Sequence, residues 1–160
     1  MRSYQVFAAM SPERAADVLH VLNEKAPGVY VQAVAAASAA MKARPKYLMR
    51  QPAAKRAQAV RRALARVSAN PVAGEILAVY FLECRKELLV SWLDTVGLEH
   101  DEGALAADAP PQPDKGKLDE AVDRFLGLDE DPDRMLLLAA FAAQDAIEWP
   151  DLVARLTLDG

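Results

Sequence analysis

The chain has one cysteine, Cys84, among 160 residues. An intrachain disulfide is therefore excluded, and so is a zinc site built on several cysteine ligands. Long apolar runs are also missing: the longest candidate, residues 76–82, is followed at once by charged side chains, whereas about 20 apolar residues are needed to cross a bilayer. The first residues lack the apolar core of a signal peptide. We therefore expect a cytoplasmic protein that does not contact a membrane.

Glycine and aromatic residues are scarce as well, with 7 glycines and 6% aromatics. The alternation of apolar and polar residues that is typical of β-strands is not sustained anywhere in the chain. Alanine, by contrast, occurs 32 times, and it is the strongest helix former because its side chain loses no entropy in a helix. A hydrophobic fraction of 52% excludes wholesale disorder. The composition predicts an all-α protein.

Acidic residues are absent from Lys25 to Gly74, where the chain carries ten Lys and Arg. Residues 75–160 show the opposite balance, with twenty Asp and Glu against seven Lys and Arg. The net charge of −4 conceals this separation. Because the local field of a protein, rather than its net charge, attracts partners, the basic segment is the main functional signal of the sequence.

Prolines mark the starts or the ends of the predicted helices, because proline fits the first turn of a helix and breaks its interior; Pro27 and Pro45 are interpreted as helix ends. At Ser11-Pro12 and Asp131-Pro132 a capping residue precedes the proline. The predicted helices cover residues 12–25, 30–43, 52–68, 71–96, 117–126 and 135–147, with a last turn or two from residue 149. We expect a compact bundle of six to seven helices around the long central helix of residues 71–96, which is apolar over most of its circumference and ends at Gly97.

We expect residues 1–160 to form a single helical domain, since a chain of this length supports one core. The longest non-helical segment is residues 98–116, in which three prolines favour an extended connection. The same loop could separate a C-terminal helical pair, residues 117–158, from the rest. We favour one domain because the C-terminal helices are too apolar to be stable alone.

The helix predicted for residues 52–68 carries a basic stripe. At about 100° per residue, Lys55, Arg62 and Arg66 lie opposite its apolar face. Two further arginines flank the apolar face, and several Lys and Arg residues precede the helix in the sequence. The candidate interaction face consists of Lys55, Arg62, Arg66, Arg56, Arg61 and Arg50, with Lys42, Arg44 and Lys46 as its extension.

Three functions are compatible with these features. The leading hypothesis is a non-enzymatic module for protein–protein interaction or self-association, since charge separation and apolar helix surface occur without a catalytic motif. The first alternative is a nucleic-acid-associated protein whose stripe contacts phosphates. Two observations weaken it: Tyr47 is the only aromatic residue near the stripe, and the isoelectric point of about 5.2 is low for this class.

The second alternative is a metal or small-molecule site near His100, whose neighbours Asp101 and Glu102 supply carboxylates. Adjacent loop residues need special geometry to face one ion, and the same segment suits a helix end followed by a polar loop. The chain has no Gly-rich phosphate loop, no Gly-x-Ser-x-Gly motif and no histidine near Cys84. We therefore predict no catalytic residue and no cofactor. A buried Arg85, on the apolar side of the 71–96 helix, would need a carboxylate partner.

Overall fold

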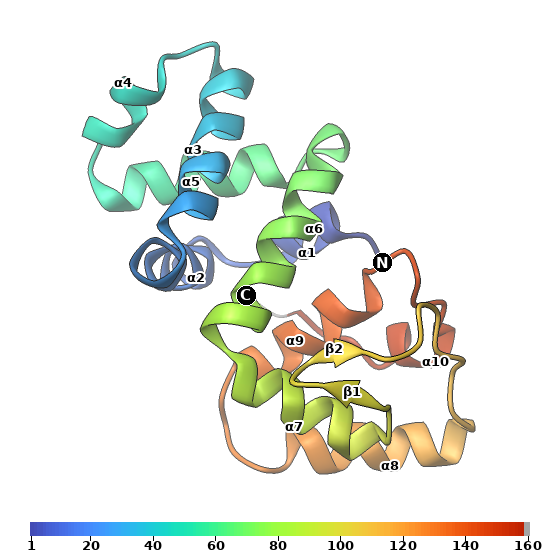
Figure 1. Cartoon of the computed structure of the whole chain (residues 1–160). Helices are drawn as coiled ribbons and strands as arrows, with labels where there is room; N and C mark the ends of the chain where they lie inside the picture. The colour runs from blue at the N-terminus through green and yellow to red at the C-terminus, as the bar shows by residue number, and fades with distance from the viewer. Residues whose placement is uncertain (159–160) are drawn as a thin grey trace.

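Figure 1 shows the computed structural model of the protein, which describes residues 1–158. The prediction of an all-α fold is confirmed, with ten α-helices in this part of the chain. That number exceeds the expected six to seven for three reasons: residues 3–9 form an additional helix, the short turn before residue 52 is helical, and the segment 71–96 is divided in two.

The elements follow one another in this order. The first half contains α1 (Ser3–Ala9), α2 (Pro12–Lys25), α3 (Pro27–Met41), α4 (Pro45–Arg50) and α5 (Ala53–Leu64). A turn of 3-10 helix, η1 (Val67–Ala69), leads into α6 (Asn70–Val79), the π-turn η2 (Tyr80–Cys84) and α7 (Lys86–Val96). The chain continues with β1 (His100–Asp101), β2 (Ala104–Leu105), α8 (Lys115–Leu126), α9 (Asp133–Ala142) and α10 (Pro150–Val153).

The proline signal at Ser11-Pro12 predicts the start of α2 correctly. At the start of α2, Oγ of Ser11 accepts the backbone N–H of Arg14 at 3.1 Å, and Pro12 occupies the first helical position. A proline begins α10 as predicted. Prolines also begin α3 and α4, where the sequence pattern instead predicts helix ends at Pro27 and Pro45 and a helix start near residue 30. The predicted stop of α7 is also confirmed, because Gly97 adopts the left-handed conformation with φ of 80°.

The prediction of one continuous helix over residues 71–96 is wrong. In η2 the N–H of Arg85 donates to the carbonyl of Tyr80, five residues earlier, at 3.0 Å. Arg85 itself leaves the helical conformation, with φ −133° and ψ 45°, and the chain bends there (Figure 1). A π-turn needs neither Pro nor Gly, which usually mark a kink in a sequence, so nothing local predicts this break.

Packing explains why the segment bends. α9 contacts both halves, but α6 packs mainly on α1 and α3, whereas α7 packs mainly on α8. One straight helix would point its apolar residues at a single set of neighbours. The wider π-turn changes the helix phase between α6 and α7, so each half presents its apolar side to its own neighbours.

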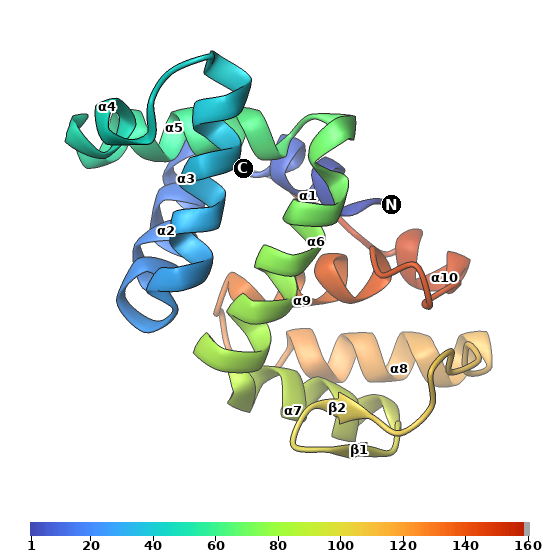
Figure 2. The same ribbon diagram turned by 45° about the horizontal axis from the view of Figure 1, so that its top comes forward.

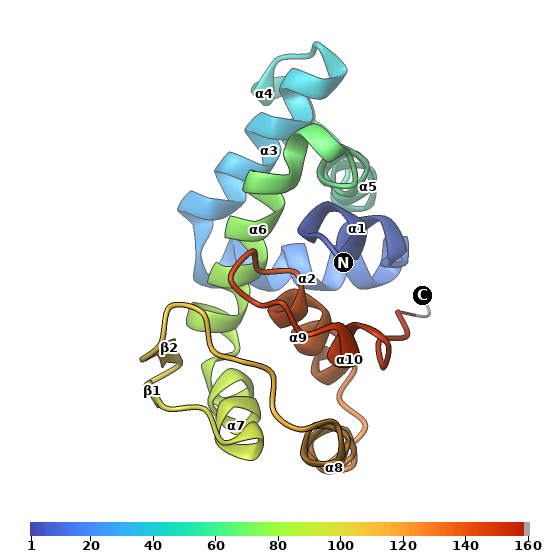
Figure 3. The same cartoon turned by 90° about the vertical axis from the view of Figure 1, so that its right-hand side faces the viewer.

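The helices form two groups, which Figures 2 and 3 show from two sides. α2, α3 and α5 pack on one another in one group, and α7, α8, α9 and α10 pack together in the other. α6 runs between the groups and contacts α3 and α9, while α1 contacts α5, α6 and α9. α7, before the 98–116 segment, and α8, after it, pack directly against each other.

The buried side chains of both groups belong to one connected hydrophobic core. Its C-terminal part is aromatic: Trp92 lies with its ring centroid 5.4 Å from that of Phe125 and 5.9 Å from that of Phe141, which in turn lies 5.1 Å from Trp149. Nε1 of Trp149 donates to the carbonyl of Pro110 at 2.9 Å and so fixes the proline-rich segment against the core. Among residues 1–158, no helix combines the length and apolarity that a membrane span requires.

The 98–116 segment contains a small antiparallel hairpin. His100 pairs with Leu105, and Asp101 pairs with Ala104. The two turn residues between them, Glu102 and Gly103, have φ values of 49° and 95°, and two positive φ values are typical of the tight turns that connect hairpin strands.

Candidate functional site

Seven exposed cations gather on the end of α3, on α4, and on and just after α5. These helices lie at one end of the molecule, away from the hairpin and α8 (Figure 1). We call this set the basic surface; it consists of Lys42, Arg44, Lys46, Arg50, Lys55, Arg62 and Arg66. α5 ends at Leu64, earlier than predicted, so Arg66 lies on the connection to η1 and not on the helical stripe itself.

No carboxylate neutralises the basic surface within the described chain. Every ion pair found in residues 1–158 takes its cation from outside the acid-free window, for example Arg85 or Arg155. The acids of residues 75–158 that form ion pairs do so within their own half of the chain or with Arg14. The sequence left open whether these acids cover the stripe; in the described structure they do not pair with it.

Arg56, one of the residues of the predicted interaction face, forms hydrogen bonds within the fold. Its Nε donates to the hydroxyl of the buried Tyr30 at 2.6 Å, and its Nη1 donates to the carbonyls of Met49 at 3.0 Å and Gln51 at 3.1 Å. The side chain therefore fixes α4 and the following turn against α3 and α5.

Arg61 is also used inside the fold. Its Nε donates to the carbonyl of Met10 at 2.6 Å, and its Nη2 donates to that of Ala8 at 3.2 Å. The last carbonyls of a helix lack partners within the helix and carry partial negative charge, so Arg61 caps the C-terminus of α1. Of the six predicted face residues, Arg50, Lys55, Arg62 and Arg66 thus remain exposed and unpaired within residues 1–158.

Exposed apolar side chains alternate with the cations, which the sequence analysis missed. Met41, Tyr47 and Met49 are 49%, 55% and 44% exposed. α4 buries only Leu48, so its remaining residues point away from the core. A six-residue helix has too few residues for periodicity to assign its faces, and the exposure of these side chains follows only from how α4 packs on α3.

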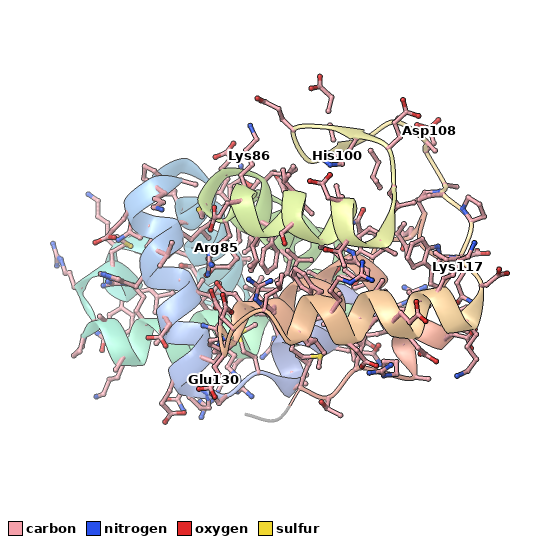
Figure 4. All side chains as sticks on the ribbon, turned by 90° about the horizontal axis from the view of Figure 1, so that it is seen from below. Arg85, Lys86, His100, Asp108, Lys117 and Glu130 are labelled. Carbon is pink, nitrogen blue, oxygen red and sulfur yellow. The ribbon has the colours of Figure 1, made fainter. Side chains whose placement is uncertain are left out.

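A second cluster of charged groups lies at the bend between α6 and α7. The carboxylate of the buried Asp133 accepts a hydrogen bond from the hydroxyl of Tyr80 at 2.6 Å and contacts the guanidinium groups of Arg85 and Arg14. Arg85 also donates to Asp131 at 2.7 Å. In Figure 4 Arg85 lies between the ribbons, with Glu130 at the outer edge. The expected carboxylate partners of Arg85 therefore come from the start of α9.

The pKa values in this region reflect burial and ion pairing. Burial alone would lower the pKa of Arg85, but its hydrogen bonds to Asp131 and Glu87 outweigh burial and raise it. Burial raises the pKa of the Tyr80 hydroxyl and of the Cys84 thiol. Cys84 is 4% exposed, so a neutral, shielded thiol is expected, and the position is unsuited to a nucleophile. With its charges paired, the cluster is a structural contact between the two helix groups.

His100 is held in a structural contact as well. Its Nδ1 accepts the N–H of Gly103 at 3.0 Å, so its Nε2 carries the hydrogen that faces Asp94 at 2.7 Å. Glu102 pairs with Lys86 at 2.8 Å. These contacts fix the hairpin on α7. In the part of the chain that the structure describes, His100, Asp101 and Glu102 do not converge, and no group of three or more His, Cys, Asp or Glu side chains could hold a metal ion.

Comparisons of the chain with models of protein families, with curated protein sequences and with solved structures gave no match. The function of the protein is therefore inferred from the geometry of the molecule.

Proposed function

We propose that this protein is a non-enzymatic interaction module whose basic surface binds an acidic, partly apolar segment of another protein. The observation that carries the proposal is the state of the seven cations. They lie together at one end of the molecule without a carboxylate partner in residues 1–158, although the chain has an excess of acids. Cations with a purely structural purpose would be expected to contact carbonyls or acids, as Arg61 does.

The exposed apolar side chains define what kind of partner fits. Met41, Tyr47 and Met49 add flexible and aromatic contact area between the charges, and methionine and tyrosine are enriched in protein interfaces. An acidic segment that also carries leucine or phenylalanine would use both the charge and the apolar area. A partner with charge alone would leave the apolar side chains uncovered.

Nucleic acid fits this surface less well. The bases of a single strand stack on aromatic side chains, and Tyr47 is the single aromatic side chain that the surface exposes. The isoelectric point of about 5.2 is also low for nucleic-acid-binding domains. Self-association through opposite charges would join the basic end of one copy to the acidic end of the next, and such a head-to-tail contact tends to form open filaments unless the geometry closes it.

Binding measurements with defined probes test the proposal. The probes are a labelled peptide of alternating glutamate and leucine, a polyglutamate peptide of equal length, and single-stranded and duplex oligonucleotides. We expect the glutamate–leucine peptide to bind most tightly, with an affinity that falls as salt rises. The double substitution Lys46→Glu with Arg62→Glu should weaken its binding by at least about tenfold, which corresponds to about 1.4 kcal/mol.

A control with the same change in charge is Lys117→Glu with Arg124→Glu, since both residues are exposed on α8 and outside the basic surface. This variant should bind the peptide nearly as well as the unchanged protein. Tighter binding of the oligonucleotides than of either peptide would replace the proposal by the nucleic-acid alternative. Concentration-dependent assembly in sedimentation, lost on Lys46→Glu with Arg62→Glu, would replace it by self-association. Absence of binding to all probes would refute it.

A further inference from the structure

A second surface feature lies along α6, outside the basic surface. A groove of about 540 Å³ runs between α6 with η2, α7, the hairpin and the end of α9. Its walls are mostly apolar, and Leu82, at 42% exposure, is an uncovered part of them. The larger apolar side chains of the walls include Leu77, Phe81, Leu82, Leu89, Leu105 and Phe141.

The charge of the groove is of one sign. Asp108 and Asp145 line it, together with the amide of Gln144, and no Lys, Arg or His side chain does. A neighbouring recess of about 310 Å³ shares Asp145 and adds Glu148. Asp108 lies on the loop that follows the hairpin (Figure 4). The apolar groove is thus lined in part by carboxylates that form no ion pair within the described chain.

We propose that this groove binds a small apolar amine. The hydrocarbon or aryl body of the ligand lies against Leu82, Leu89 and Phe141, and its ammonium group lies at Asp108 and Asp145. The volume of the groove falls in the range of about 300–1,000 Å³ that is usual for small-molecule sites, and such sites combine apolar walls with a few polar groups that orient the ligand.

Charge complementarity selects the amine over other amphipathic molecules. A fatty acid or a phosphate ester would bring its negative charge next to two carboxylates, with no guanidinium or ammonium group in the lining to compensate. A neutral alcohol of the same shape would gain only the apolar contacts. Because both carboxylates are exposed, water screens them, and we expect a moderate preference for the amine. The inference is independent of the basic surface.

Titration calorimetry with three matched ligands tests the inference: phenylbutylamine, phenylbutanol and phenylbutyrate. We expect the amine to bind about tenfold more tightly than the carboxylate, with the alcohol between them. The double substitution Asp108→Asn with Asp145→Asn should remove the preference for the amine and leave the affinity for the alcohol unchanged. The control, Glu120→Gln with Glu130→Gln, removes two exposed carboxylates outside the groove and should retain the preference.

A bulky side chain tests the location of the site. Ala78 lines the groove from an exposed helical position, so Ala78→Trp should fill the groove and abolish binding of all three ligands without disturbing the core. Ala35→Trp, at an exposed position of α3 outside the groove, is the control and should bind like the unchanged protein. Equal or tighter binding of the carboxylate, unchanged binding by Ala78→Trp, or no binding of any ligand to the folded protein would overturn the inference.

Discussion

The hydroxyl of Tyr80 donates a 2.6 Å hydrogen bond to Oδ2 of Asp133, and this bond joins two residues that lie 53 positions apart in the chain. Tyr80 belongs to the π-turn and Asp133 begins α9. Because Arg14 of α2 and Arg85 of the bend contact the same carboxylate, one buried anion holds elements of both helix groups together.

Loss of that anion should destabilise the protein strongly. Asp133→Ala leaves two largely buried guanidinium groups without their shared partner, and breaking a buried ion pair on one side costs about 3–5 kcal/mol. We expect the free energy of unfolding, measured with urea, to fall by at least about 3 kcal/mol. Glu130→Gln, an exposed neighbour, should change it by less than about 0.5 kcal/mol. Equal stability of the two variants would contradict the conclusion that the Asp133 carboxylate stabilises the fold.

Asp129 should contribute a pH-dependent part of the stability. Hydrogen bonds from Arg134 and from the N–H of Asp131 lower the pKa of its carboxyl to about 2 in the folded protein, against about 3.9 in an unfolded chain. A lowered pKa stabilises the fold above the unfolded value, and the stabilisation is lost as the pH falls from about 4 towards 2. Unfolding free energies measured over this interval should fall less steeply for Asp129→Asn than for the unchanged protein. Parallel curves would show that the carboxyl is not perturbed.

Two glycines should respond oppositely to alanine. Gly97→Ala forces a side chain into the left-handed conformation at φ 80° and should reduce stability by about 1 kcal/mol. Gly116 lies in the first turn of α8, and a Cβ there would meet nothing within 4 Å. Gly116→Ala should therefore raise stability by about 0.5–1 kcal/mol, because alanine restricts the unfolded chain. Thermal unfolding of both variants would reveal the opposite signs, and shifts of the same sign would contradict the expectation.

Adjacent arginines on α5 should differ in their effect on stability. Arg61→Ala leaves the carbonyls of Ala8 and Met10 without their donor, and we expect a loss of about 1–3 kcal/mol. Arg62→Ala removes an exposed cation with no partner in residues 1–158 and should be neutral to within about 0.5 kcal/mol. Chemical denaturation of the two variants compares them directly, and equal losses would mean that Arg61 does not cap α1.

Local sequence signals predicted much of the fold. Proline with a capping residue marks the start of α2, and Gly97 marks the end of α7, because these signals act through the backbone of a few neighbouring residues. The break at Arg85 escaped prediction because it has no such signal. It results from the different neighbours of α6 and α7, and those neighbours are distant in the sequence.

The basic surface was likewise predicted in part by the sequence and decided in part by helix packing. The acid-free window from Lys25 to Gly74 predicts where positive charge gathers, and Arg50, Lys55, Arg62 and Arg66 of that window are exposed. The helical wheel places Arg62 opposite the apolar face and Arg61 beside that face, but it does not show what Arg61 contacts. Arg61 reaches the carbonyls of Ala8 and Met10 only because α1 packs against the end of α5.

The sequence by itself determines the all-α class, most helix starts and the separation of charge, because composition and short-range backbone preferences are enough for these properties. Tertiary structure alone decides that the acids of the second half leave the basic surface unpaired, that Asp133 binds cations of both helix groups, and that an apolar groove with two carboxylates forms along α6. These are contacts between residues far apart in the chain, and their geometry depends on how whole helices pack.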